Sequence, residues 1–289
     1  GCSSEVVVLA GHDYMMSCVA AAPDGRVITG SADKTIKVWR DGACERTIDY
    51  VATAVAVLPG GARFVSGSSD GTAKLWTLDG ALERTFEVGS DALSVAALPD
   101  GVHFVVGIVN AGEARLYHVD GTLVHTFKHG RTVWTVGVTP DGQHIISGAS
   151  DKLVKVWSVA SKSLVSTCAG HTDFANAVAA MPDGQRILSG SNDVRVWLLD
   201  GTLENALELH TIDINALVAL PDNQHALSGS RDRTVKLFNV NDGAVLRTFT
   251  HHTDFVSSLA LLPDGLRSVS YTHLRANETR EAGGWRGGR

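Results

Sequence analysis

The chain has little of what several classes of protein require. Its 289 residues include only four cysteines and no CxxC pair, so the sequence predicts neither a zinc site nor a disulfide framework. No apolar run approaches the roughly 18 residues of a membrane-spanning helix, so no transmembrane span is predicted. The first residues also lack a basic segment followed by an apolar run, so nothing marks the chain for secretion. We therefore expect an intracellular protein, cytoplasmic or nuclear, that does not bind a membrane.

Positive charge and phosphate-binding loops are also scarce. The 25 lysines and arginines are outnumbered by 31 aspartates and glutamates, which gives a net charge of −6. Neutralising the phosphates of a nucleic acid requires a basic face, so we expect no direct nucleic-acid partner. No Gly-rich phosphate loop, EF-hand spacing or histidine pair at ligand spacing occurs. The sequence therefore predicts no metal and no cofactor.

Proline is rare, yet every proline marks the same turn. Pro-Asp-Gly stands at five of the seven prolines, and the other two begin close variants. The steps from one proline to the next are 36, 40, 41, 42, 39 and 42 residues. A repeat of this length, rich in short alternating apolar segments and without a helix signal, predicts a unit of four strands. The seven prolines are Pro23, Pro59, Pro99, Pro140, Pro182, Pro221 and Pro263.

Each unit has its segments in the same order. An alternating apolar segment such as 54–58 precedes the proline turn, and a second short strand such as 63–66 follows it and ends at Gly. A turn that carries Asp leads to a third strand that ends at Trp, as in 33–39 and 151–157, and a fourth strand such as 83–86 follows a Gly turn. This order predicts an all-β protein made of four-stranded antiparallel sheets.

These units resemble the WD-repeat β-propeller family. The resemblance rests on the Gly-His pairs at 11–12 and 170–171, the Asp turn and the third strand ending in Trp, and it covers residues 5–270. Where the family often has Asp after this Trp, the chain has other residues, such as Arg40 and Thr77. The resemblance implies a seven-bladed ring whose first strands line a central channel, with residues 1–270 as the propeller and its last blade truncated. It also implies a non-enzymatic scaffold or adaptor that binds other proteins or peptides within a multiprotein complex.

The resemblance further implies a buried hydrogen-bonded set in each blade, which we call the brace. It joins a His before the first strand, a Ser or Thr at the end of the second, the turn Asp and the Trp of the third. A buried hydrogen bond of this kind contributes about 1 kcal/mol, and removing one partner costs about 1 to 3 kcal/mol. The brace positions hold His12, Thr29, Asp33, Trp39, Ser66, Asp70, Trp76, Ser147, Asp151, Trp157, His171, Ser189, Asp193, Trp197, His210, Ser228 and Asp232.

Two enzymatic interpretations are open to this pattern, and we disfavour both. Ser, His and Asp in one neighbourhood suggest nucleophilic catalysis, but a catalytic triad is normally single whereas this trio recurs from unit to unit. The segment 67–71 matches G-x-S-x-G, but a nucleophile elbow needs a helix after the turn and here strands flank both sides. An enzyme that uses the central channel remains as the less favoured alternative.

Some units depart from the pattern. The second has Ile48 at the His position, and the third has Val88 there and lacks the rest of its brace as well. In the seventh, Tyr271 stands where every other unit has Gly, and residues 271–289 show no strand alternation. We therefore expect 271–289 to be an unrelated tail, non-native or disordered. We also expect the apolar run 6–9 to be the fourth strand of the seventh blade, in a ring that closes imperfectly.

The resemblance places partner contacts on the narrow face where each first strand begins. The contact positions lie three and five residues after the His position and one before the turn Asp. We expect the aromatic residues Trp134, Phe174 and Phe255 to act as anchors. The charged residues Asp213 and Arg231 would lie at the rim, an arrangement typical of an interaction hot spot. Besides Ser69, Ser150, Asn192 and Val51, the positions hold Met15, Ser17, Thr53, Asp91, Leu93, Thr132, Trp134, Phe174, Asn176, Asp213, Asn215, Arg231, Phe255 and Ser257.

A more specific function is suggested by one unit. Residues 29–39, followed by Cys44-Glu45-Arg46-Thr47, are similar to repeats of the phospholipase-A2-activating, ubiquitin-binding propellers. The alternative to a general scaffold is therefore a ubiquitin-binding adaptor.

Overall fold

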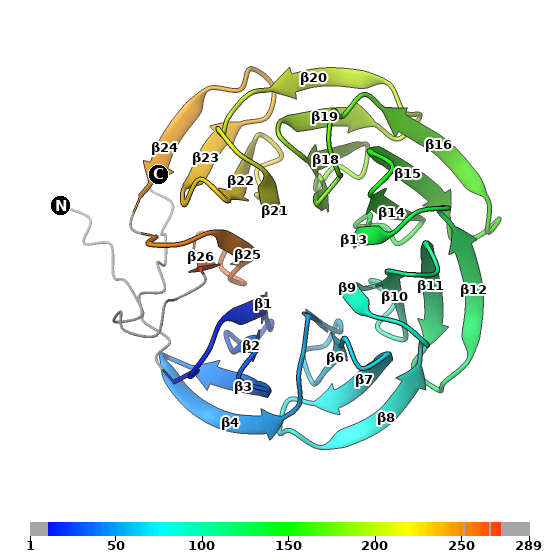
Figure 1. Cartoon of the computed structure of the whole chain (residues 1–289), viewed down its shortest axis with the longest axis vertical. Coiled ribbons are helices and arrows are strands. Elements are labelled where there is room, and N and C mark those ends of the chain that lie inside the picture. The colour runs from blue at the N-terminus through cyan, green and yellow to red at the C-terminus, as the bar shows by residue number, and fades with distance from the viewer. Residues whose placement is uncertain (1–10, 251, 266, 273–289) are drawn as a thin grey trace.

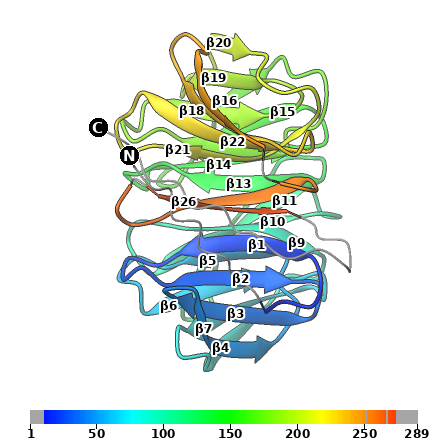
Figure 2. The same cartoon turned by 90° about the vertical axis from the view of Figure 1, so that its left-hand side faces the viewer.

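The computed structural model describes residues 11–250, 252–265 and 267–272, which form a ring of antiparallel sheets around an open centre (Figure 1). Within these residues six sheets have four strands and a seventh has two. Seen from the side, the strands run between the two faces of a thick disc (Figure 2). This confirms the predicted all-β, seven-bladed propeller with an incomplete last blade. We number the blades 1 to 7 in chain order.

Each complete blade is a simple up-and-down sheet, and its strands follow one another from the centre of the ring outwards. The innermost strands are β1 (Met16–Ala21), β5 (Ala54–Val57), β9 (Ala92–Ala97), β13 (Val133–Val138), β17 (Ala177–Ala180), β21 (Ile214–Ala219) and β25 (Val256–Leu261). The second strands are β2 (Val27–Ser31), β6 (Arg63–Gly67), β10 (His103–Ile108), β14 (His144–Ala149), β18 (Arg186–Gly190), β22 (His225–Ser230) and β26 (Ser268–Thr272). The third strands are β3 (Thr35–Arg40), β7 (Thr72–Thr77), β11 (Glu113–His118), β15 (Leu153–Ser158), β19 (Val194–Leu198) and β23 (Val235–Asn239). The outermost strands are β4 (Ala43–Asp49), β8 (Leu82–Glu87), β12 (Leu123–Lys128), β16 (Leu164–Ala169), β20 (Leu203–Leu207) and β24 (Val245–Phe249).

Burial along the strands follows their place in the ring. The second strands β2 and β14 are almost entirely buried, whereas most of the outermost strand β4 is exposed. On the third strand β3, Ile36 and Val38 are buried and alternate with half-buried residues, as expected for a strand with one face toward the next sheet. The ring is therefore tightly packed in its middle layer and exposed to solvent at its rim.

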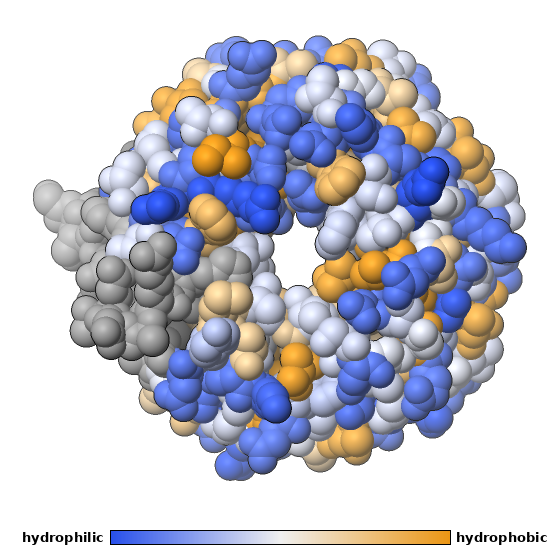
Figure 3. Space-filling model, viewed as in Figure 1, coloured by the Kyte–Doolittle hydropathy of each residue, from blue (hydrophilic) through white to orange (hydrophobic). Residues whose placement is uncertain are grey.

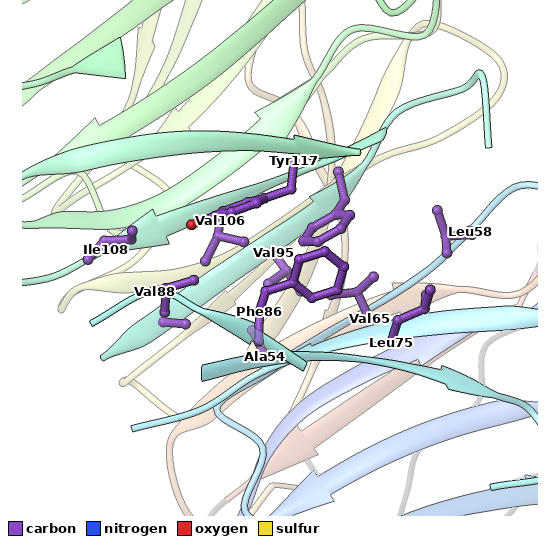
Figure 4. Close-up of a cluster of buried hydrophobic side chains, with 13 residues drawn as sticks. Ala54, Leu58, Val65, Leu75, Phe86, Val88, Val95, Val106, Ile108 and Tyr117 are labelled. Carbon is purple, nitrogen blue, oxygen red and sulfur yellow. The ribbon is translucent and has the colours of Figure 1, made fainter. Parts of the chain in front are cut away.

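The hydrophobic core lies between neighbouring sheets. Between blades 2 and 3, the rings of Phe86 and Phe104 meet edge to face with centroids 4.8 Å apart, and Tyr117 lies 5.6 Å from Phe86 (Figure 4). Burying an apolar side chain of this size contributes about 1.5 to 3 kcal/mol. Because such clusters join residues of two blades, each blade is stabilised by its neighbours.

A glycine at or next to the end of the second strand in blades 1 to 6 lets the next blade approach closely. A Cβ at Gly67 would lie 2.6 Å from the carbonyl oxygen of Ala92, and one at Gly148 would lie 2.9 Å from that of Ala175. Both carbonyls belong to the next blade, at or just before its innermost strand. The Gly that the sequence repeats at this position is therefore required by the packing of neighbouring blades.

Several expectations concern chain segments that the structure describes only in part. The strand β26 includes Tyr271 and Thr272, two residues beyond the predicted end of the propeller. Residues 273–289, expected to be an unrelated tail, lie outside the described residues, as does the run 6–9 expected to close the ring. The division into 1–270 and 271–289 stays a prediction.

In the part of the chain that the structure describes, no helix is long and apolar enough to cross a membrane.

Candidate functional site

In blade 1 the brace residues meet around the hydroxyl of Thr29. Trp39 donates its indole N–H to Thr29 Oγ1 at 2.7 Å, and His12 Nε2 lies 2.8 Å from the same oxygen. The other ring nitrogen, His12 Nδ1, lies 2.8 Å from Asp33 Oδ2. One consistent assignment has Thr29 donating to Nε2 while Nδ1–H donates to the carboxylate, so the neutral imidazole links the two groups. The chain of bonds ties the third strand and its turn to the loop before the first strand.

The turn aspartate is held in its ionised form. Partial burial alone would raise the pKa of Asp33, but hydrogen bonds from Thr35, His12 and the backbone N–H of Asp13 outweigh it and lower the pKa to about 2. Folding therefore stabilises the carboxylate at neutral pH.

Blades 5 and 6 repeat the arrangement. His171 lies 2.7 Å from Asp193 and 2.6 Å from Ser189, and Trp197 donates to the same serine at 2.7 Å. In blade 6, His210 lies 2.8 Å from Asp232 and 2.7 Å from Ser228. Phe238 takes the place of Trp in that blade, so Ser228 receives no indole N–H.

Blade 4 has the same residues with the imidazole turned round. His129 Nδ1 lies 2.8 Å from Ser147, and its Nε2 lies 3.3 Å from Asp151. Trp157 donates to Ser147 at 2.8 Å, as in the other blades. Burial lowers the pKa of His129 to about 4, and the positive charge of Lys155 acts in the same direction, although Asp151 opposes the shift. The imidazole is therefore neutral at physiological pH.

Blade 2 keeps its turn aspartate bonded without a histidine, which the sequence did not lead us to expect. Tyr50, two residues beyond the His position, places its hydroxyl 2.7 Å from Thr72 Oγ1 and 3.3 Å from Asp70. Trp76 still donates to Ser66 at 2.8 Å. The signal available in the sequence was a residue with a polar tip close to an unfilled His position.

Blade 3 replaces the brace with a different set of contacts. Arg115 pairs with Glu113 at 2.8 Å and donates to the backbone carbonyl of Val88 at 3.0 Å. Lys155 makes the corresponding bond to the carbonyl of His129 in blade 4, at 2.8 Å. The third unit thus lacks the His, Ser and Trp of the brace, but its third strand is tied to the preceding loop through Arg115.

A second polar network joins neighbouring blades at or just before their innermost strands, and it uses several predicted contact residues. Ser17 donates to the carbonyl of Ala52. Thr53 donates to the carbonyl of Ala92 at 2.5 Å, and Asn215 donates to that of Val256 at 3.1 Å. The side chains of Ser17, Thr53 and Asn215 are therefore engaged in joining blades. The two residues of each pair lie about one repeat apart, so aligning the units superimposes them and does not show that they are in contact.

The predicted contact residues three positions after the His position lie beside those that precede the turn Asp. The backbone N–H of Arg231 donates to the carbonyl of Asp213 at 2.9 Å, and that of Ser150 donates to Thr132 at 3.0 Å. Arg231 also pairs with the Asp213 side chain at 2.9 Å and lies over the ring of Phe255, 5.6 Å from its centroid.

The three predicted anchors are exposed to solvent. Trp134, Phe174 and Phe255 have exposed fractions of 36%, 42% and 36%. Trp134 and Phe174, from blades 4 and 5, stack with their centroids 6.3 Å apart and their planes 21° from parallel. We call this pair the aromatic platform. The half-buried predicted contact residues are Met15, Ser17, Val51, Thr53, Asp91, Leu93, Thr132, Ser150, Asn176, Asp213, Asn215 and Ser257.

Around one mouth of the central channel, apolar patches alternate with strongly hydrophilic ones (Figure 3). The described residues contain no group of three or more His, Cys, Asp or Glu side chains arranged to hold a metal ion.

Comparison with known proteins places these repeats in a family. The family described as WD domain, G-beta repeat matches residues 3–40, 42–77, 121–158, 162–197 and 201–239, which make up more than half of the chain. The irregular third unit is not among these five matches.

Parts of the chain are similar to proteins from several organisms. The chain is 31% identical over 77 residues to MST50-interacting protein 11 of Pyricularia oryzae, which is 24% of each chain. It is 34% identical over 100 residues to the small ribosomal subunit protein RACK1y of Oryza sativa subsp. japonica, or 31% of this chain and 30% of that one. It is 32% identical over 108 residues to nuclear distribution protein nudF 1 of Talaromyces marneffei, or 27% of this chain and 24% of that one.

Each match spans less than a third of the relative's own length. The repeat matches and the bladed ring lead to the same conclusion: the chain belongs to the WD-repeat family of β-propellers.

Proposed function

We propose that this protein is a non-enzymatic scaffold that binds protein or peptide partners on the face carrying the aromatic platform. The observation that carries the proposal is the stacked pair of Trp134 and Phe174, which leaves two large rings exposed to solvent. Tryptophan is among the residues most enriched in the energetic anchors of protein interfaces, and phenylalanine is enriched in interfaces as well. The net charge of −6 favours protein over nucleic acid as the partner.

The arrangement of the braces supports a structural role for their Ser, His and Asp residues. Ser66, Ser147 and Ser189 are fully buried, and each hydroxyl oxygen already accepts an indole N–H. A nucleophilic serine must reach its substrate and be activated by its histidine. The braces therefore act as fixed supports for the loops of the binding face, and we propose no catalysis.

The names of two similar proteins fit a role in assemblies. One is named as a protein that interacts with MST50, and another is named as a component of the small ribosomal subunit. We propose the same general role for this chain, within a multiprotein complex of its own.

Site-specific photo-crosslinking tests the location of the binding face. A photoreactive phenylalanine analogue is introduced at Phe174 in one variant and at Leu246 in another. Leu246 is 55% exposed and lies on the outermost strand β24. We expect protein crosslinks that are specific to position 174. Equal crosslinking from both positions, or crosslinks from position 246 alone, would contradict the proposed face.

A further inference from the structure

Two loops of the binding face have the same sequence and the same local structure. Residues 171–174 and 252–255 both read His-Thr-Asp-Phe, in blades 5 and 7. In each loop the aspartate accepts a hydrogen bond from the backbone N–H of the following phenylalanine at 2.8 Å. Both phenylalanines, Phe174 and Phe255, are exposed. The two loops therefore provide an internal comparison within one molecule.

The rings of Phe174 and Phe255 differ in whether the preceding blade places a cation over them. At Phe255 the guanidinium of Arg231 lies 5.6 Å from the ring centroid and is held there by Asp213. We call the boundary between two neighbouring blades a seam. At the seam of blades 4 and 5, which carries Phe174, Ser150 occupies the position that Arg231 has at the seam of blades 6 and 7. Ser150 and Arg231 are equivalent in the structure as well as in the repeat. The backbone N–H of each donates to the carbonyl of the residue three positions after the histidine of its own blade. The ring of Phe174 thus lacks the cation that Phe255 receives from within the chain.

A second ring, that of Trp134, enlarges the aromatic surface at the seam of blades 4 and 5. Trp134 stacks on Phe174 and remains 36% exposed, whereas the corresponding residue at the other seam is Asn215. Among the described residues, no Lys or Arg side chain lies over the ring of Trp134 or Phe174. An indole offers the most favourable face for a cation, and a planar guanidinium also stacks on it.

Charges beside the platform are compatible with a cation. Asp173 adjoins Phe174 and forms no ion pair with any residue that the structure describes. Lys152 lies nearby and donates to the carbonyl of Thr172 at 2.6 Å. At the seam of blades 6 and 7, Arg233 occupies the position that Lys152 has in blade 4, and Arg231 still lies over Phe255. A basic residue at this position is therefore compatible with a guanidinium over the phenylalanine of the loop.

We propose that the aromatic platform of Trp134 and Phe174 binds an arginine side chain presented by a protein partner, beside the carboxylate of Asp173. The inference rests on the proposed function and adds the chemistry of the partner. The partner's guanidinium supplies at the seam of blades 4 and 5 the cation that Arg231 supplies at the seam of blades 6 and 7.

Two acetylated pentapeptides test this chemistry, one with a central arginine and one with citrulline, which has nearly the same shape and no charge. The full-length protein is labelled with 5-fluorotryptophan, and the Trp134 resonance is assigned by its loss in Trp134→Phe. We expect the arginine peptide to shift this resonance saturably and the citrulline peptide to bind at least tenfold more weakly. Equal binding of the two peptides, or no shift by either, would overturn the inference.

Two variants make the test specific to the seam. The double variant Thr132→Asp/Ser150→Arg places an arginine, and the aspartate that holds it, at the positions of Arg231 and Asp213, so it should abolish the response by covering the platform from within. Leu246→Arg adds an arginine on the outermost strand β24, away from this seam, and should leave the Trp134 response unchanged. Full peptide binding by the folded double variant would contradict the inference. Crosslinks at position 174 without a preference for arginine would remove this inference and keep the proposed function, whereas failure of those crosslinks would remove the proposed function itself.

Discussion

The hydroxyl of Tyr50 lies 3.3 Å from a carboxylate oxygen of Asp70, so a tyrosine does in blade 2 what a histidine does in blades 1, 5 and 6. The same hydroxyl lies 2.7 Å from Thr72, and its ring packs 5.6 Å from that of Trp76. The turn of the blade is therefore held from the preceding loop although the histidine is missing. The support survives because the tyrosine reaches the same carboxylate from two residues farther along the chain.

Replacing Tyr50 by Phe should destabilise the protein while leaving its core filled. The ring remains, but Asp70 and Thr72 lose a hydrogen-bond partner, so the free energy of unfolding should fall by about 1 to 2 kcal/mol. Chemical denaturation measures this change. Tyr14→Phe is the control, because Tyr14 is 61% exposed and should change stability by less than about 0.5 kcal/mol. Equal effects of the two substitutions would show that the Tyr50 hydroxyl contributes nothing.

The network between blades predicts a difference between two asparagines at the same repeat position. Asn215→Ala removes the bond to the carbonyl of Val256 and should lower the free energy of unfolding by about 1 kcal/mol or more. Asn176→Ala should cost clearly less, because in the described structure the Asn176 side chain donates to no other residue. Denaturant titration of both variants provides the measurement. A larger loss in Asn176→Ala would contradict the assignment of Asn215 as a link between blades.

The close approach of neighbouring blades predicts a steric penalty at Gly67. A Cβ there would lie 2.6 Å from the carbonyl oxygen of Ala92, so Gly67→Ala should destabilise the protein by about 1 to 3 kcal/mol through overpacking. At Gly137 the nearest atom to a Cβ would be a side-chain carbon of Val178 at 3.3 Å, which can shift more easily. Thermal unfolding of Gly67→Ala and Gly137→Ala should therefore show the larger loss in the first. The reverse order would contradict this account of the repeated glycine.

His129 predicts a dependence of stability on pH. Burial lowers its pKa in the folded state to about 4, against 6.5 for an unperturbed histidine, so below pH 6.5 the unfolded chain binds a proton that the folded protein does not. The contribution of neutral His129 is therefore complete above pH 6.5 and is lost as the pH falls toward 4.

The variant His129→Gln isolates this effect. The difference in unfolding free energy between the wild type and the variant should shrink by about 2 kcal/mol from pH 7.5 to pH 5. Denaturant titrations at the two pH values measure that difference. A constant difference would show that His129 has an ordinary pKa in the folded protein.

How far the sequence predicted the structure depended on whether a feature repeats along the chain. The strand order and the incomplete seventh blade follow from units aligned at one period. The family resemblance, applied to each unit in turn, implied contacts such as those of His171 with Asp193 and Ser189. Tyr50 and Arg115 escaped this reasoning because each fills its role from a position that the repeat does not assign to it. The bonds between blades escaped it because they join equivalent strands of different units, which a repeat superimposes instead of pairing.

The sequence predicted the positions of the contact residues but not which of their side chains are exposed. The exposure of Trp134 and Phe174 depends on how two blades meet, and the same repeat position that exposes Trp134 engages Thr53 and Asn215 in bonds between blades. Position within the repeat therefore predicted which loops carry contact residues. Only the packing of blade against blade determines which side chains remain available.

The affinity of a partner for Trp134→Ala tests the central claim most directly. A protein crosslinked from position 174 is purified, and its dissociation constants for the wild type, Trp134→Ala and Leu246→Ala are measured by titration calorimetry. Truncating an aromatic anchor should weaken binding by about 2 kcal/mol, or roughly thirtyfold, in Trp134→Ala. Leu246→Ala, on the outer strand β24, should bind like the wild type. Wild-type affinity in a folded Trp134→Ala protein would contradict the claim that partners bind on the aromatic platform.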